Sequence, residues 1–336
     1  MMQTVGVVGA GSWGTALANL LAKKGHTVRM WSYEADVADT INGSHENTKY
    51  MKGITLAPTL SASTSLEEVV RGADAILSVS PAQHVRSVMM QACEFIGPDA
   101  LVVSASKGIE TGTLKTMAHV LAEVLPKGVG ASSCYLSGPS FALEVARELP
   151  TAVTIAGRVP AAVERAQQLF QDSYFRVYTS DDVIGIELGG SLKNVIAIAS
   201  GMGVGLGLGH NATAALITRG LAEISRLGMK MGANPLTLAG LSGMGDLILT
   251  CTGDLSRNRH VGVELGKGRS IEDILGEMVM VAEGVQTARA AYMLAQRSEI
   301  EMPIVEEVYA VLFEARTARQ AVENLMLREP KPELWQ

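Results

Sequence analysis

The chain has 336 residues, of which 47% are hydrophobic and 18% are charged, and its formal net charge is −6. This composition excludes an extensively disordered chain, and the length predicts two domains of roughly 150 to 200 residues each. The net negative charge produces no positive electrostatic field that would attract nucleic acid or an anionic membrane, so we expect neither as a partner. An anionic substrate would therefore need a local cluster of cations.

Alternating strand and helix signals fill the first half of the chain, which is the pattern of a mostly parallel sheet covered by helices. The expected strands are residues 4–9, 27–31, 75–80, 100–104, 135–137, 152–156 and 177–179. The expected helices are residues 13–24, 81–93, 113–125, 140–147 and 161–171. After about residue 181 only helical patterns follow. We therefore predict an α/β protein with a Rossmann-like, doubly wound dinucleotide-binding domain over residues 1–180, and an all-helical substrate and catalytic domain over residues 181–336.

A glycine-rich turn, Gly9-Ala10-Gly11-Ser12-Trp13-Gly14, joins the first expected strand to the first expected helix. Gly9 would permit the tight turn, and Gly11 would let backbone amides reach a pyrophosphate. Gly14 would let the helix pack against the sheet. The bare pattern is weak evidence, but its place between a strand and a helix predicts a dinucleotide site.

The end of the second strand leaves the choice of cofactor open. The strand runs into Ser32, Tyr33 and Glu34, and no Asp closes it. Glu34 could hold the ribose of NAD, whereas Ser32 and Tyr33 could tolerate a 2′-phosphate, with Arg29 as a nearby cation. We expect NADP or NAD, with a slight preference for NADP because the Asp is missing.

Polar groups follow two later strands, at the sheet edge where ligands bind in open α/β folds. They are Lys107, in Ser106-Lys107-Gly108, and the pair Gly138 and Ser140 in Gly138-Pro139-Ser140. Each has a plainer interpretation: Lys107 as a solvated loop cation, and Ser140 as a helix cap.

Two segments in the second half add further polar groups. Ser256 is placed as a helix N-cap with Arg257 and Asn258 in the first turn, which together suit a dianionic phosphate. Alternatively, Arg257 could pair with Asp254 on the surface. Asp246 could simply cap the helix that begins there.

Lys193 is the fully charged side chain of an otherwise uncharged, Gly-, Ala- and Ile-rich stretch between Glu187 and Arg219. In a helix it lies off the apolar stripe and shares a face with small residues such as Gly189, so that another backbone or a ligand could approach the amine. The alternative is a lysine that extends its ammonium to water. Burial would instead lower its pKa and suit it to proton transfer.

The apolar stretch 194–218 is long enough to raise the question of a membrane span, but it is interrupted by alternating glycines. We interpret it as a buried helix followed by a flexible glycine loop. The glycines are Gly201, Gly203, Gly205, Gly207 and Gly209.

The N-terminus lacks the basic segment of a signal peptide. The odd, widely spaced cysteines Cys93, Cys134 and Cys251 favour reduced thiols in a cytoplasmic protein, and no metal-ligand spacing is present.

These motifs resemble those of the bacterial NAD(P)-dependent sn-glycerol-3-phosphate dehydrogenases along nearly the whole chain. The segments that carry the resemblance are Gly9 to Ala16, Ser106 to Gly108, Ser137 to Ser140, Gly190 to Ala197, Ile217 to Glu223, Gly243 to Leu247, Ser256 to Asn258 and Val281 to Gly284. Two positions depart from the family pattern. Ser191 replaces a frequent Ala, a small-for-small change that should be harmless. Tyr33 replaces a frequent His or Arg, which leaves the cofactor choice open.

The resemblance implies an enzyme that interconverts dihydroxyacetone phosphate and sn-glycerol 3-phosphate by hydride transfer with NAD(P)H, and so supplies phospholipid synthesis. It implies that Lys193 is the proton acceptor or donor, with Lys107 and Asp246 as further catalytic residues. The implied substrate-binding residues are Lys107, Gly138, Ser140, Lys193, Asp246, Ser256, Arg257 and Asn258. The implied cofactor contacts are Gly9, Gly11, Ser12, Trp13, Gly14, Tyr33, Lys107, Ala142, Arg257, Val281 and Glu283. A homodimer is also implied, and no metal.

Two other functions are compatible with part of this pattern. A related reductase of a β-hydroxyacid or ketopantoate would share the nucleotide fold and the helical lysine, but would not explain Ser256, Arg257 and Asn258 as a phosphate site. A non-catalytic nucleotide sensor would need only the glycine turn, and would leave Lys107, Lys193 and Asp246 unexplained.

Overall fold

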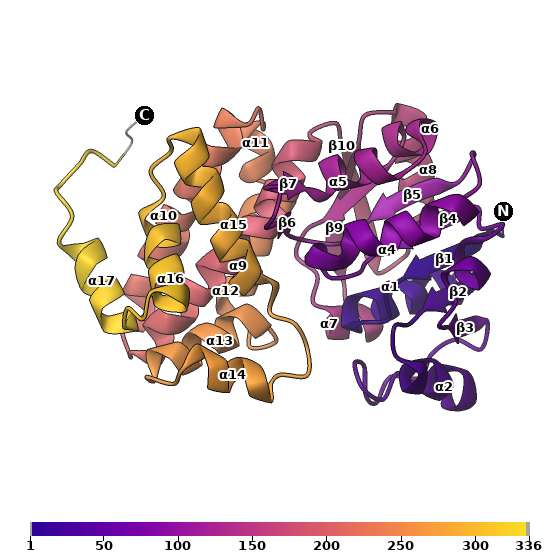
Figure 1. Ribbon diagram of the computed structural model, residues 1–336, viewed down its shortest axis with the longest axis horizontal. Helices are drawn as coiled ribbons and strands as arrows, with labels where there is room; N and C mark the ends of the chain where they lie inside the picture. Colours follow the sequence, from indigo (N-terminus) through magenta and orange to yellow (C-terminus); the bar gives the residue numbers. More distant parts are fainter. Residues whose placement is uncertain (1, 334–336) are drawn as a thin grey trace.

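Eight strands form one sheet in the N-terminal half of the computed structural model, which describes residues 2–333 (Figure 1). The strand order is β10-β9-β8-β5-β4-β1-β2-β3, and every pair is parallel except β8 with β9. The bounds are β1 Thr4–Val8, β2 Thr27–Trp31, β3 Leu60–Ser63, β4 Ala75–Ser78, β5 Leu101–Ser104, β8 Cys134–Ser137, β9 Thr151–Gly157 and β10 Phe175–Ser180. The chain adds β2 and β3 on one side of β1 and then returns to add β4 and the later strands on the other side. This change of side gives the doubly wound topology that the sequence predicts.

Helices cover both faces of this sheet, and each face has its own hydrophobic core. Leu17 of α1 and Phe170 of α8 belong to one core, and Met89 of α4 and Leu121 of α5 belong to the other. The bounds are α1 Ser12–Lys23, α2 Ala35–Ser44, α3 Leu66–Val70, η1 Ala82–His84, α4 Val85–Ala92, η2 Cys93–Phe95, α5 Met117–Val124, α6 Lys127–Ala131, α7 Ala142–Ala146 and α8 Pro160–Phe170.

Several elements differ from the sequence prediction. β3 and the short helices beside it were not expected, because residues 60–63 read as a polar Ser-rich segment. The helix expected over residues 113–125 begins only at Met117, since residues 109–116 form the antiparallel hairpin β6 Ile109–Glu110 and β7 Lys115–Thr116. The helix expected from Ser140 begins at Ala142, because the Ser140 hydroxyl donates to the Gly138 carbonyl in the turn.

The C-terminal half is helical, and α9 (Val183–Gly205) is its central element (Figure 1). It is long and apolar enough to cross a membrane, but 89% of its apolar window is buried inside the protein, as expected of a core helix. Leu192, Val195 and Ile196 lie in the core of this half. The remaining bounds are α10 Gly209–Lys230, α11 Pro235–Leu238, η3 Leu241–Gly245, α12 Asp246–Thr252, α13 Arg257–Gly266, α14 Ile271–Glu277, α15 Glu283–Ser298, α16 Pro303–Phe313 and α17 Ala318–Met326.

The predicted flexible glycine loop is wrong for residues 201–205, which continue α9 to its end. A Cβ added at Gly201 would lie 2.1 Å from the carbonyl oxygen of Arg259, and one added at Gly205 would lie 2.3 Å from that of Val263. Both carbonyls belong to α13, so these glycines let two helix backbones pack closely. The turn itself is short and precedes Gly209, which begins α10.

We predict that Gly201→Ala destabilises the protein by about 1–3 kcal/mol, because the new methyl group would overlap the α13 backbone. Gly203→Ala on the same helix is the matched control, since its Cβ would meet only Leu208, at 3.8 Å. That change should be neutral or stabilise by about 0.5–1 kcal/mol through helix propensity. Chemical unfolding measures both, and equal effects of the two substitutions would contradict close α9–α13 packing.

Candidate active site

Lys193 is buried rather than extended into water: it is 7% exposed. Its Nζ lies 2.5 Å from Oδ1 of Asp246 and 2.9 Å from the hydroxyl oxygen of Thr250. Asp246, the first residue of α12, is itself 1% exposed. The structure therefore excludes the surface interpretation of Lys193 and pairs it with a buried carboxylate.

The small-residue face of α9 explains how this pair forms. A Cβ at Gly189 would lie 2.4 Å from the carbonyl oxygen of Ser242, so the π-helical segment η3 lies directly against α9 there. One turn further along both segments, Lys193 meets Asp246. Short π-helical segments are frequent at functional sites, and this one sets the position of the carboxylate.

Lys107 brings the first domain to the same carboxylate. Its Nζ donates to Oδ2 of Asp246 at 2.7 Å and to the carbonyl oxygen of Gly138 at 3.1 Å. That carbonyl also accepts the Ser140 hydroxyl at 2.9 Å. Lys107, Gly138, Ser140, Lys193 and Asp246, predicted separately from the sequence, thus form one connected group, and Lys107 is not a solvated loop cation.

The pKa of Lys193 is lowered to about 8, first of all by burial. The neighbouring Lys107 ammonium lowers this pKa further, whereas the Asp246 carboxylate opposes part of the drop. The amine can therefore exist in both protonation states near neutral pH, which a group that exchanges a proton with substrate requires. Two ammonium groups around one carboxylate also leave the site with a net positive charge.

Thr250 belongs to this site but was not predicted. It lies one helical turn after Asp246, donates its hydroxyl to the Asp246 carbonyl at 2.6 Å and accepts from Lys193. The four-residue spacing in α12 is the sequence signal that could have found it.

The Ser-Arg-Asn segment lies at the start of α13, against α9. Ser256 is the N-cap, as predicted, and its hydroxyl accepts from the Arg259 amide at 3.2 Å. The Asn258 side chain donates to Oδ1 of Asn194 at 2.9 Å and accepts from the Gly284 amide at 2.9 Å. Because Asn194 follows Lys193 directly, this network fixes the segment beside the buried amine.

Arg257 does not pair with Asp254 on the surface; Arg259 makes that ion pair, at 2.9 Å. Burial lowers the pKa of Arg257, and the nearby Glu283 carboxylate opposes the shift. Glu283 begins α15 and accepts from the Ala82 amide at 3.2 Å, which connects the two domains. Burial raises the pKa of Glu283 to about 7.

The glycine turn has the geometry that a dinucleotide needs. A Cβ at Gly14 would lie 2.1 Å from the Gly9 carbonyl oxygen, so the turn closes only with glycine, whereas the space beside Gly11 is open. Helix α1 has no side-chain cap, which leaves the N-terminal amides of Ser12 and Trp13 to a ligand. These residues therefore fit the pyrophosphate of NAD(P).

Three other predicted cofactor contacts lie outside the hydrogen-bonded group around Lys193. Tyr33 follows β2 and is 83% exposed, Ala142 begins α7, and Val281 is exposed in the segment before α15. Lys193 makes its side-chain hydrogen bonds to Asp246 and Thr250 rather than to any of these three residues. Arg29 points elsewhere: its guanidinium donates to the Arg71 carbonyl at 2.8 Å.

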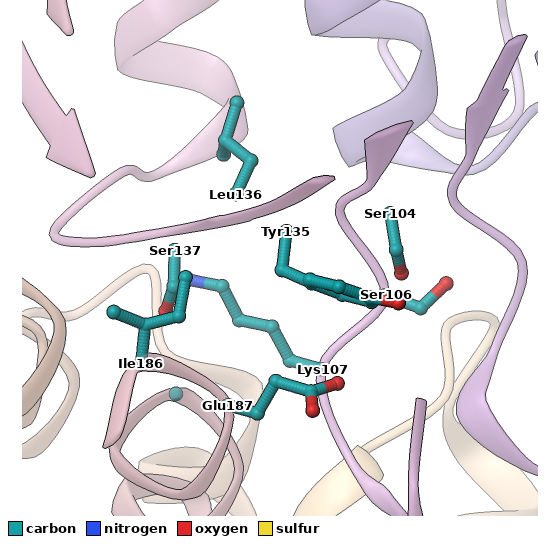
Figure 2. Close-up of a pocket in the computed structure, with 9 residues that line it drawn as sticks. Ser104, Ser106, Lys107, Tyr135, Leu136, Ser137, Ile186 and Glu187 are labelled. Atoms are coloured by element: carbon teal, nitrogen blue, oxygen red, sulfur yellow. The ribbon is translucent and has the colours of Figure 1, made fainter. Parts of the chain in front are cut away.

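A small cavity is lined by Lys107, Ser137 and Tyr135, among others. Figure 2 shows the Lys107 side chain running between Tyr135 and Glu187 toward Ser137. The accessible volume of the cavity is about 10 Å³, too small for a dinucleotide or a three-carbon phosphate. Its wall includes Glu187 of α9, which accepts from the Thr116 hydroxyl at 2.6 Å and the Ala118 amide at 2.8 Å at the start of α5. Glu187 thus joins the two domains beside the site.

Within residues 2–333 no group of His, Cys, Asp and Glu side chains is arranged to hold a metal.

Comparison with known families gives the same assignment for both halves. Residues 4–163 match the profile described as the NAD-dependent glycerol-3-phosphate dehydrogenase N-terminus, and residues 182–323 match that of its C-terminus. The chain belongs to this dehydrogenase family. Among its relatives, "Glycerol-3-phosphate dehydrogenase [NAD(P)+]" of Geobacter sulfurreducens is 56% identical over 335 residues, and the match covers the whole of both chains. The protein of the same name from Myxococcus xanthus is 52% identical and covers 98% of each.

Solved structures agree with this family assignment. Glycerol-3-phosphate dehydrogenase from Coxiella burnetii superposes with a TM-score of 0.93 at 39% identity, covering 97% of this chain and 99% of that one. A ketopantoate reductase from Ralstonia eutropha has a TM-score of 0.59 at 15% identity, covering 96% and 99% of the two chains, and so shares the fold. The α/β class with a helical C-terminal domain is confirmed.

We predict that Lys193 is half-deprotonated near pH 8, and that its two charged neighbours shift this value in opposite directions. Asp246→Asn removes the carboxylate that raises the pKa and should lower it, whereas Lys107→Met removes a like charge and should raise it. Acylation by acetic anhydride as a function of pH, quantified at Lys193 by peptide mass spectrometry, measures the pKa. Shifts of the same sign would contradict the electrostatic assignment.

Proposed function

We propose that this protein is an NAD(P)-dependent glycerol-3-phosphate dehydrogenase that interconverts dihydroxyacetone phosphate and sn-glycerol 3-phosphate and supplies the latter for phospholipid synthesis. One observation carries the proposal: the buried Lys193 amine lies between Asp246 and Thr250 at the junction of a dinucleotide fold and a cationic site. Full-length similarity to proteins named for this reaction supports it.

In the proposed mechanism, Lys193 exchanges the proton of the substrate oxygen. A dinucleotide held at the glycine turn would supply the hydride to C2 during reduction, or accept it during oxidation. During reduction, the Lys193 ammonium donates its proton to the oxygen that becomes the C2 hydroxyl; during oxidation, the neutral amine removes that proton. Asp246 and Thr250 hold the amine in position. Reduction therefore needs Lys193 protonated and is favoured below its pKa, whereas oxidation is favoured above it.

The remaining proposed contacts orient the two ligands. Ser256, Arg257 and Asn258 anchor the phosphate, far from the reacting carbon, through a helix N-terminus and a charged side chain. Lys107, Gly138 and Ser140 complete the substrate site. The proposed cofactor contacts are Gly9, Gly11, Ser12, Trp13, Gly14, Tyr33, Lys107, Ala142, Arg257, Val281 and Glu283.

Three further features remain proposals: the division into domains 1–180 and 181–336, a cytoplasmic location and a homodimer. β10 ends at Ser180 and α9 begins at Val183, which supports the proposed boundary. Sedimentation of the purified chain tests the homodimer, and a monomer at micromolar concentration would contradict it.

The decisive test is oxidation of NADH or NADPH in the presence of dihydroxyacetone phosphate, followed by absorbance. Wild type should turn over, and Lys193→Ala should reduce kcat by about 10²- to 10⁴-fold, because a general acid is lost. Titration calorimetry should show that the variant still binds both ligands. Near-normal turnover in Lys193→Ala would contradict the mechanism. Turnover of ketopantoate instead would favour the related reductases, and nucleotide binding without turnover of either substrate would favour a sensor.

Arg257→Ala should raise KM for dihydroxyacetone phosphate by about 10- to 100-fold, because a charged hydrogen bond to phosphate is worth about 1.5–3 kcal/mol. Arg297→Ala is the control, since Arg297 is exposed at the far end of α15. Initial rates over a range of substrate concentrations give both constants. An unchanged KM in Arg257→Ala would place the phosphate anchor elsewhere.

A further inference from the structure

Beyond β2, Glu34 makes contacts with Lys49 and Tyr50 that the sequence did not predict. Glu34 follows the strand as the N-cap of α2, and its Oε1 accepts the Tyr50 hydroxyl at 2.6 Å and the Lys49 ammonium at 3.1 Å. Two side chains from a separate loop thus fix the Glu34 carboxylate. Burial, and then the hydrogen bond to Glu34, raises the pKa of Tyr50, so the hydroxyl stays protonated and keeps donating.

The loop that carries Lys49 and Tyr50 is attached to the glycine turn itself. Asn47 is fully buried, and its side-chain amide donates to the carbonyl of Ala10 and to the hydroxyl of Thr15, both at 2.8 Å. The Asn47 oxygen accepts the Tyr50 amide at 3.1 Å. Ala10 lies between the first two glycines of the turn. The Glu34 carboxylate is therefore held in a fixed relation to the proposed pyrophosphate site.

The charges near Glu34 disfavour a further anion. Lys49 is the cation bound to it, and Asp36 acts electrostatically on both Lys49 and Tyr50. Two carboxylates and one ammonium give a net charge of −1 at this end of the strand. Arg29, the cation that the sequence offered for a 2′-phosphate, donates instead to the Arg71 carbonyl.

The neighbouring Tyr33 adds an exposed aromatic surface without adding charge. Its ring is 83% exposed and meets Trp31 edge to face, with 6.4 Å between ring centroids. An exposed aromatic ring of this kind can stack on a base. An adenine on Tyr33 would bring its ribose toward Glu34, the next residue along the chain.

From this geometry we propose that the adenosine end of the site selects a dinucleotide with a free ribose 2′-hydroxyl, NAD(H), and that Glu34 is the selecting residue. The inference rests on the proposed dehydrogenase function. A carboxylate accepts hydrogen bonds from the ribose hydroxyls but repels a 2′-phosphate. Lys49 is already paired with Glu34, so its ammonium offers no uncompensated positive charge to a 2′-phosphate.

Titration calorimetry of the full chain with NADH and with NADPH tests the proposal without relying on activity. We expect NADH to bind about tenfold more tightly or better. The same order should hold for adenosine 5′-monophosphate against adenosine 2′,5′-bisphosphate, which probe the adenosine end alone. Equal or tighter binding of the 2′-phosphorylated ligands would overturn the inference.

Glu34→Gln removes the repulsion and part of the ribose binding, so NADH should bind more weakly, NADPH more tightly, and the ratio of their dissociation constants should shrink. Asp39→Asn makes the same chemical change at an exposed position of α2 and should leave the ratio unchanged. An unchanged ratio in Glu34→Gln, with unfolding temperature retained, would also overturn the inference. If neither dinucleotide binds wild type, the proposed dehydrogenase function fails and the inference fails with it.

Discussion

The buried carboxylate of Asp246 is the group on which the site depends. It is 1% exposed and accepts from two ammonium groups, Lys193 on α9 and Lys107 beyond β5. A buried charge without a partner is costly, and removing one partner of such a pair typically costs about 3–5 kcal/mol. This carboxylate thus links the helical domain to the nucleotide domain, and it positions Lys193, the proposed proton-transfer group, between them.

Close backbone packing places that carboxylate. Gly189 admits the π-helical segment before Asp246, and Gly201 and Gly205 admit α13 further along the same helix. Both contacts occur on α9, so a single rigid helix fixes Lys193, its carboxylate partner and the Ser256 helix N-terminus. Glycine is costly within a helix, but here it permits approaches that any side chain would block.

The two halves of the molecule contribute different chemistry at their junction. The sheet presents the uncapped start of α1 and the turn at Gly138. The helices present the buried amine and the Arg257 guanidinium, whose pKa burial lowers. Glu283 and Glu187 accept backbone amides across the boundary, at Ala82 and Ala118. The proposed substrate would therefore bind where both domains supply donors.

The sequence by itself determined the fold class, the glycine turn, the Ser256 cap and the identity of the charged residues, because local periodicity and turn chemistry are encoded over a few neighbouring positions. It could not determine that Lys107, Lys193 and Asp246 share one contact, since 139 residues separate Lys107 from Asp246 along the chain. The glycine-rich end of α9 does not form the predicted loop, and its close packing against α13 cannot be read from the local sequence. Likewise, the contacts of Lys49 and Tyr50 that fix the Glu34 carboxylate appear only in the folded chain. Tertiary structure decided these points, because burial and charge pairing depend on distances in space that no local pattern records.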